Sequence, residues 1–150
     1  METKKIVITG GANRIGRSIA LELASYDTEI VIHYLKSFTA AKKLKVELEN
    51  LGSIVHLFKA DLNNLKQTQG IIPFAFKKMK GLNCLINNAS IFENDNLVNF
   101  SDKNFLRHMN INLKAPAILI KGFTKKYKGK DGNIVNIIDQ RVEKLTPFFF

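Results

Sequence analysis

The chain has 150 residues, a length that suits a single domain large enough to bury a hydrophobic core. Hydrophobic residues make up 45% of it and charged residues 24%, which are ordinary values for a globular protein and exclude a disordered chain. The formal net charge of +10 comes mostly from lysines spread along helix-like segments, without zinc-ligand spacing or an RNA-binding aromatic motif. We therefore expect no nucleic-acid partner.

Cysteine usage and apolar segments bear on the compartment. Cys84 is the single cysteine, lies within an apolar run and cannot form an internal disulfide, so we expect a buried structural thiol. Near the N-terminus the only apolar stretch is 6–8, far too short for a signal peptide, and no segment has the length of a transmembrane helix. We expect a cytoplasmic protein with no membrane partner.

Short apolar runs alternate with longer segments of helical spacing along the chain. The pattern predicts strands over residues 4–9, 29–34, 54–59, 82–87 and 133–138, and helices over 15–24, 39–51, 65–79 and 101–127. Strands that are continuous in Ile, Val and Leu indicate a parallel sheet covered on both faces. The predicted fold class is α/β, a doubly wound parallel sheet of the Rossmann type with about five strands, in one domain.

A glycine-rich stretch follows the first predicted strand and leads into a helix. It reads Thr9-Gly10-Gly11-Ala12-Asn13-Arg14-Ile15-Gly16. Glycines at such a turn let the backbone approach a pyrophosphate at the helix N-terminus. The strict G-x-G-x-x-G spacing is absent, and an ordinary strand-to-helix turn is the alternative. The stretch resembles the T-G-x-x-x-[GR]-[IL]-G pattern of short-chain dehydrogenases/reductases, which implies cofactor contacts from Gly10, Asn13, Arg14, Ile15 and Gly16.

Three later stretches carry the same resemblance. Residues 87–90 read Asn-Asn-Ala-Ser and resemble the family's N-N-A-G motif, with an Asx turn as the alternative. Asn112 matches an asparagine that, in the family, supports the active site through a bound water and a helix distortion. Residues 132–140 match the strand G-x-I-V-N-I-S-S, with Asp139 in place of the catalytic serine. The resemblance implies cofactor contacts from Asn88, Ala89 and Ser90, and catalytic roles for Asn112 and Asp139.

The residues after the second strand bear on the choice of cofactor. NAD-specific Rossmann domains usually place a carboxylate there to bond the ribose 2′-hydroxyl. This chain has His33, Tyr34, Lys36 and Ser37 instead, and a lysine with a hydroxyl suits a 2′-phosphate. NADPH is therefore favoured over NADH, although lysine lacks the planar fork of arginine. The alternative is that His33 and Tyr34 merely end the strand.

A second pair of residues matches the family's adenine-contacting Asp-Leu. Asp61 and Leu62 follow the third predicted strand. The resemblance implies that they contact the cofactor. For Asp61 the alternative is that it caps the next helix, as loop aspartates often do.

Within the family, the closest resemblance is to the pteridine reductases. Residues 33–37 are similar to their H-Y-x-R-S segment, and Arg14, Ser90 and Phe92 match residues that contact the pterin substrate. There the phenylalanine stacks on the pterin, and an aspartate at the position of Asp139 takes part in proton delivery. The resemblance implies hydride transfer from NADPH to a pterin, a folate or another carbonyl compound, in a family that commonly forms homo-oligomers.

The catalytic tyrosine and lysine of the family are missing. No Tyr-x-x-x-Lys occurs in the sequence, and the spacing from Asp139 places the pair just beyond Phe150. We therefore expect the N-terminal part of a Rossmann domain, with an uncovered fifth strand and no catalytic turnover. The alternative is a non-enzymatic gene remnant with at most residual nucleotide binding.

Overall fold

The computed structural model describes residues 3–93, 98, 100–129 and 131–139. It contains one parallel sheet of five strands in the order β3-β2-β1-β4-β5. The strands are β1 (Lys4–Ile8), β2 (Thr28–Tyr34), β3 (Ile54–Lys59), β4 (Cys84–Asn87) and β5 (Asn133–Asn136). The predicted α/β fold with a doubly wound parallel sheet is confirmed.

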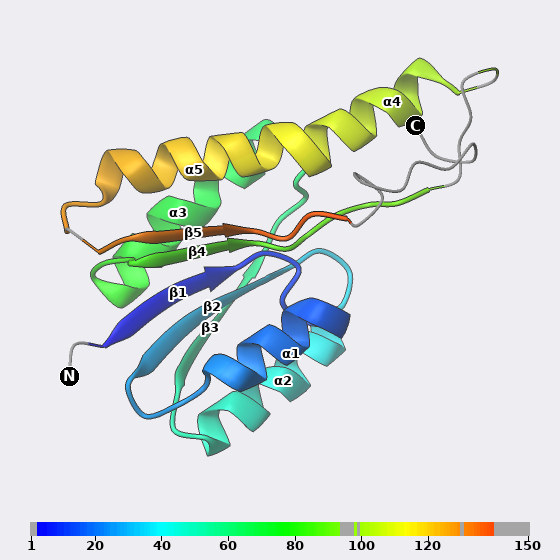
Figure 1. Ribbon diagram of the computed structural model, residues 1–150. Helices are drawn as coiled ribbons and strands as arrows, with labels where there is room; N and C mark the ends of the chain where they lie inside the picture. Colours follow the sequence, from blue (N-terminus) through cyan, green and yellow to red (C-terminus); the bar gives the residue numbers. More distant parts are fainter. Residues whose placement is uncertain (1–2, 94–97, 99, 130, 140–150) are drawn as a thin grey trace.

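Helices cover both faces of this sheet. In chain order they are α1 (Arg14–Leu23), α2 (Phe38–Asn50), α3 (Leu65–Met79), α4 (Asp102–His108), the π-helical η1 (Met109–Lys114) and α5 (Ala115–Lys126). Helices α1 and α2 lie against one face, and α3 and α5 against the other (Figure 1). Side chains along β1 alternate between the two cores, with Ile6 and Ile8 in the α1–α2 core and Val7 in the α3–α5 core.

The chain changes direction across the sheet at β1. After β3 it returns through α3 to the other side of β1 and forms β4 there. In open α/β sheets the crevice between the two strands at such a switch point is where ligands bind. The loops that follow β1 and β4 therefore meet at the edge where a functional site is expected.

The helix predicted over 101–127 is interrupted. Its middle, η1, has π-helical geometry, and α5 begins with a proline in its first turn, Pro116. Proline has no N–H to donate to the carbonyl four residues earlier, that of Asn112, and its ring crowds that carbonyl. A wider turn accommodates this, and π-helical turns are frequent at functional sites.

Element boundaries differ from the prediction by a few residues. Helix α3 and strand β3 begin and end as predicted, whereas β4 begins at Cys84 and β5 ends at Asn136. The prediction of a buried thiol is only partly confirmed, because Cys84 is partly exposed at the start of β4, opposite the exposed Asn133. Its partial burial raises the pKa of the Cys84 thiol.

Strand β5 is uncovered, as expected. All four of its residues are exposed, and in the described part of the chain it pairs with β4 alone. The exposed fractions of Ile137 and Ile138, which follow the strand, are 38% and 75%. Among the helices described, none combines the length and the apolarity that crossing a bilayer requires.

Truncation of Leu119 tests the α3–α5 core. This α5 side chain is 1% exposed, whereas that of Leu113, in η1, is 60% exposed. Leu119→Ala should lower the free energy of unfolding by about 2–5 kcal/mol, because it leaves a cavity among packed side chains. Leu113→Ala should change it by less than about 0.5 kcal/mol. Urea denaturation followed by circular dichroism measures both, and equal effects would contradict the described packing.

Candidate functional site

Thr9 and Asn88 join the loops that follow β1 and β4. The Thr9 hydroxyl accepts hydrogen bonds from the backbone N–H groups of Asn88 and Ala89, both at 3.0 Å. The Asn88 side-chain amide donates to the carbonyls of Thr9, at 3.0 Å, and Gly10, at 3.1 Å. We call these bonds the Thr9–Asn88 clamp. The Asn88 amide thus bonds the loop of another strand, which an Asx turn alone would not require.

Two glycines are required by this clamp. Gly10 has a φ of 61°, and a Cβ there would lie 2.9 Å from the Cα of Ala89. At Gly16 a Cβ would lie 2.6 Å from the Asn88 side-chain nitrogen and would collide with the Gly10 carbonyl oxygen. A side chain at either position would push the two loops apart. The glycines therefore permit a close approach of the loops after β1 and β4. An ordinary strand-to-helix turn would not require such an approach.

The N-terminus of α1 is open to an anion. Arg14 is its first residue, with a φ of 48°, and the preceding Asn13 makes no side-chain capping bond. Instead the Asn13 amide donates to the Ser37 hydroxyl at 2.8 Å, which ties the glycine segment to the turn after β2. With no acidic residue in the first turn, the positive end of the helix dipole is not neutralised from within the helix. Such an end suits a phosphate group.

The imidazole of His33 is hydrogen-bonded to the backbone of the glycine segment. Its Nδ1 accepts the Gly10 N–H at 3.1 Å, and its Nε2 lies 3.0 Å from the Ala60 carbonyl oxygen. The ring is therefore the neutral tautomer with its proton on Nε2. Burial, with His33 only 3% exposed, lowers the pKa of this imidazole below its ordinary value of 6.5. Both ring nitrogens are occupied, so the ring itself offers a cofactor no polar atom.

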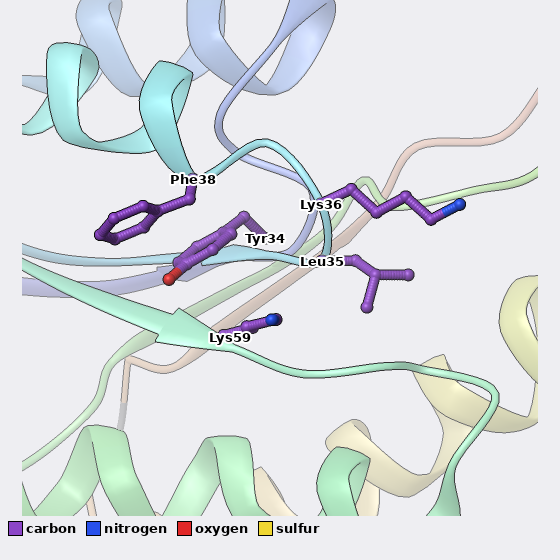
Figure 2. A pocket seen from close by; sticks show the side chains of 5 residues that line it. All are labelled: Tyr34, Leu35, Lys36, Phe38 and Lys59. Atoms are coloured by element: carbon purple, nitrogen blue, oxygen red, sulfur yellow. The ribbon is translucent and has the colours of Figure 1, made fainter.

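Tyr34 and Lys36, which follow His33, point to different places. Tyr34 is 8% exposed, and its ring packs against that of Phe38 with 5.8 Å between centroids. These two rings, with Leu35, Lys36 and Lys59, line an open hollow of about 550 Å³. Figure 2 shows the Lys36 ammonium directed away from both rings. The lysine therefore stays exposed beside the end of β2, as a phosphate-binding cation must.

The charge of Lys36 reaches the loop after β4. Glu93 lies in that loop and accepts a hydrogen bond from Arg107 of α4. That bond lowers the pKa of the Glu93 carboxyl, and the charges of His108 and Lys36 lower it further. The cation predicted to bind a 2′-phosphate thus lies close enough to the loop after β4 to act on the Glu93 carboxyl.

Asp61 and Leu62 follow β3 at the same sheet edge. Asp61 accepts the Asn63 N–H at 2.8 Å, whereas the cap of α3 is Asn64, whose side chain accepts the Gln67 N–H at 3.0 Å. The helix-capping alternative for Asp61 is therefore wrong, because Asp61 closes its own turn. Leu62 is 7% exposed and packs into the α3–α5 core, so little of it can meet a ligand.

Asn112 fixes the loop after β4 from η1. Its side-chain oxygen accepts the Ile91 N–H and its amide donates to the Ile91 carbonyl, both at 2.9 Å. The helix distortion implied for this residue is present, and it turns the side chain toward the loop. Ser90 and Phe92 lie on either side of Ile91 in the sequence, and Phe92 is 53% exposed. Asn112 thereby fixes the backbone next to Ser90 and Phe92, the two candidate substrate contacts in this loop.

Asp139 lies exposed beyond β5, in line with the ends of the other strands. The sheet is extended toward it by the Ile137 N–H, which donates to the Asn87 carbonyl at 2.9 Å. The Asn87 amide also donates to the Asn136 side chain at 2.8 Å. The sequence did not predict that Thr9, Asn87 and Asn136 hydrogen-bond neighbouring strand ends to one another. For Thr9 and Asn87 the available signal was a polar residue at the end of an apolar strand, where burial calls for a partner. Asn136 is exposed and offered no such signal.

Metal chemistry has no evident ligand set here. Within the described ranges, no group of three or more His, Cys, Asp or Glu side chains is arranged to hold a metal ion. The polar groups that converge are instead backbone N–H groups, amides, hydroxyls and one lysine. This set matches a phosphorylated organic ligand better than a cation.

Comparison with known proteins decides the family. The sequence profile of the family described as short chain dehydrogenase matches residues 4–144. The chain belongs to this family. FolM alternative dihydrofolate reductase 1 from Brucella canis, solved in complex with NADP, is 34% identical with a TM-score of 0.89, over 97% of this chain and 58% of that one.

Two further relatives are similar to this chain over nearly its whole length. A short chain dehydrogenase from Burkholderia cenocepacia, solved in complex with NADP, is 25% identical with a TM-score of 0.92, over 99% of this chain and 60% of that one. The 3-oxoacyl-acyl-carrier-protein reductase FabG of Buchnera aphidicola is 31% identical over 137 residues, which are 90% of this chain and 55% of FabG. The chain thus spans somewhat more than half the length of these relatives.

Replacement of Gly16 tests the close approach of the two loops. Gly16→Ala should lower the free energy of unfolding by about 1–3 kcal/mol, because the methyl group overlaps the Gly10 carbonyl and the Asn88 amide. Gly70→Ala is the matched control, since a Cβ at that α3 position would meet only a Phe58 ring carbon at 3.5 Å. It should raise the free energy by about 0.5–1 kcal/mol through helix propensity. Chemical denaturation that finds both changes harmless would exclude the clamp geometry.

Proposed function

We propose that this chain is the NADPH-binding part of a short-chain dehydrogenase that reduces a pterin, a folate or a related carbonyl compound. One observation carries the proposal. The glycine segment, the Lys36–Ser37 turn and the Asn88–Ser90 loop converge at the carboxyl ends of the strands, with no carboxylate after β2. A basic turn in that place favours a 2′-phosphate over a free 2′-hydroxyl.

Residues of four loops would hold the cofactor. The N–H groups at the start of α1, with Asn13, Arg14, Ile15 and Gly16, would take the pyrophosphate. Lys36 and Ser37 would take the 2′-phosphate, beside the end of β2. The remaining contacts would come from Tyr34, Asp61, Leu62, Asn88, Ala89 and Ser90. When bound, NADPH supplies a hydride, and the protein supplies its orientation against the substrate.

The substrate class follows from the loop after β4. Phe92 is a large, half-exposed ring beside Ser90, and Asn112 fixes the backbone between them. A planar pterin could stack on such a ring, with Arg14 and Ser90 as polar contacts. The likeness to FolM alternative dihydrofolate reductase 1, which covers 97% of this chain at 34% identity, supports a pterin or folate substrate.

Proton delivery is the step for which the 150 residues lack the main donor. Asp139 is proposed to take part in it, with Asn112 as the residue that positions the adjoining loop. No Tyr-x-x-x-Lys is present in the 150 residues. The second candidate is a non-enzymatic chain that keeps only nucleotide binding. The two candidates share the cofactor site and differ in whether the chain contributes to a reductase that turns over substrate.

Removal of the Lys36 charge tests the choice of cofactor. Lys36→Ala should weaken NADPH binding about 10- to 100-fold, the effect of losing one hydrogen bond to a charged group, and should leave NADH binding nearly unchanged. Lys77→Ala, which removes an exposed lysine at the end of α3, is the control and should alter neither affinity. Nucleotide fluorescence titrations of the unmodified chain and of both variants measure the six dissociation constants. Tighter binding of NADH than of NADPH by the unmodified chain would refute the proposed specificity.

Turnover by the purified 150-residue chain tests the second candidate. We expect no NADPH-dependent reduction of dihydrofolate or biopterin, because general acid catalysis needs a positioned donor. NADPH absorbance at 340 nm, a general property of the reduced nicotinamide, is the measurement. Turnover that Asp139→Ala abolishes would contradict this expectation and make Asp139 the proton donor.

A further inference from the structure

His33 is the one buried imidazole in the candidate site, and it touches two loops through its two nitrogens. The ring lies between the glycine segment, where it accepts the Gly10 N–H, and the end of β3, where it donates to the Ala60 carbonyl. The His33 backbone carbonyl also accepts the Gly11 N–H at 3.1 Å. Three hydrogen bonds of one residue thus join the carboxyl ends of β1, β2 and β3.

These hydrogen bonds, which we call the His33 bridge, hold the backbone of the glycine segment, which would face a pyrophosphate. The peptide that carries the Gly10 N–H also carries the Thr9 carbonyl, which accepts the Asn88 amide at 3.0 Å, so this peptide is held at both edges while its N–H is bound to His33. If Nδ1 were protonated it could no longer accept, and the Gly10 N–H would lose its partner inside the protein. The Thr9 carbonyl of the same peptide would stay bound to Asn88, so the peptide would be held at one edge only.

We propose that His33 is a positioning residue of the nucleotide site, holding the glycine segment in its binding shape by bridging Gly10 to Ala60. This inference rests on the proposed NADPH site. The ring makes no contact with the nucleotide itself, and its contribution is the fixed orientation of the Gly10 peptide. Preorganisation of this kind raises affinity by removing the cost of ordering the loop upon binding.

The bridge should depend on pH in a defined direction. Burial lowers the pKa of His33, against smaller opposing effects of the bond to Ala60 and the charge of Asp61. Along the adjoining segments the other charged side chains are Arg14, Lys36 and Lys59, and no shift of the His33 pKa is attributed to them. The unfolded chain therefore binds the proton more readily, so the bridge is intact above pH 6.5 and is lost as the pH falls through the lowered value.

Two isosteric variants separate the two halves of the bridge. In His33→Asn the side-chain amide ends near the place of Nδ1 and can still accept the Gly10 N–H. In His33→Gln the amide ends near the place of Nε2 and can still donate to Ala60, but the Gly10 acceptor is gone. A merely structural role would be impaired about equally by both variants, because each keeps one of the two bonds.

The first measurement needs no nucleotide. Amide hydrogen exchange of Gly10, followed by NMR, should be about tenfold faster in His33→Gln than in the unmodified chain and nearly unchanged in His33→Asn. In the unmodified chain Gly10 protection should fall below pH 6.5, and in His33→Asn this step should be absent. If a variant fails to fold, the pH dependence of Gly10 protection in the unmodified chain still tests the proposal. A Gly10 amide whose exchange does not follow His33 protonation would overturn the proposal.

The second measurement uses NADPH itself. At pH 7.5 the dissociation constant should rise about tenfold in His33→Gln and stay within about threefold in His33→Asn, since a tenfold loss is the usual effect of one hydrogen bond. Equal constants in the two variants would overturn the positioning role. If the unmodified chain binds no NADPH, the proposed function fails, and the exchange of Gly10 alone decides whether His33 holds the segment.

Discussion

Thr9 and Asn88 join the carboxyl ends of β1 and β4 through four hydrogen bonds, and the geometry of the site follows from them. Thr9 is 1% exposed, so the bonds form where water cannot replace a lost partner. Each contributes about 0.5–1.5 kcal/mol net, but a broken one would leave a buried polar group at a larger cost. The two loops at the switch point are thereby held at one distance.

Other hydrogen bonds link the joined loops to the loops that follow the neighbouring strands. His33 ties the glycine segment to the end of β3, and Asn13 ties it to Ser37 after β2. On the far side, Asn112 of η1 holds Ile91 after β4. Loops after four strands are thus linked by amides, hydroxyls and one imidazole. A preorganised site for an extended, anionic ligand results, with α1 directed at it by its N-terminus.

Much of the fold could be predicted because buried parallel strands carry a strong pattern. The run 54–59 is apolar and bounded by turn residues, and the helix 65–79 has clear periodicity, so both elements were predicted with their observed bounds. The break of the long helix at η1 was not predicted from periodicity, because a π-helical turn shifts the pattern by a single residue. Its physical cause is visible in Pro116, which removes one donor.

The candidate site could be predicted by position more readily than by role. Gly10, Gly16 and Asn88 follow strands in a family pattern, and the structure brings them into contact. The roles of His33 and Asn112 depend on partners 27 and 21 residues away, which local sequence does not encode. For Asp61, a nearby asparagine competes for the same capping position, and only the three-dimensional turn shows which one occupies it.

The convergence of the strand-end loops on one nucleotide is tested most directly by mapping NADPH onto the isotope-labelled chain by NMR. The shifts of backbone amides should change together at 10–16, 36–37, 61–62 and 88–90, with one common dissociation constant, and those of the outer surfaces of α2 and α3 should stay unchanged. Changes confined to lysine-rich helix surfaces, or absent at saturating NADPH, would contradict a dinucleotide site at the β1–β4 switch point.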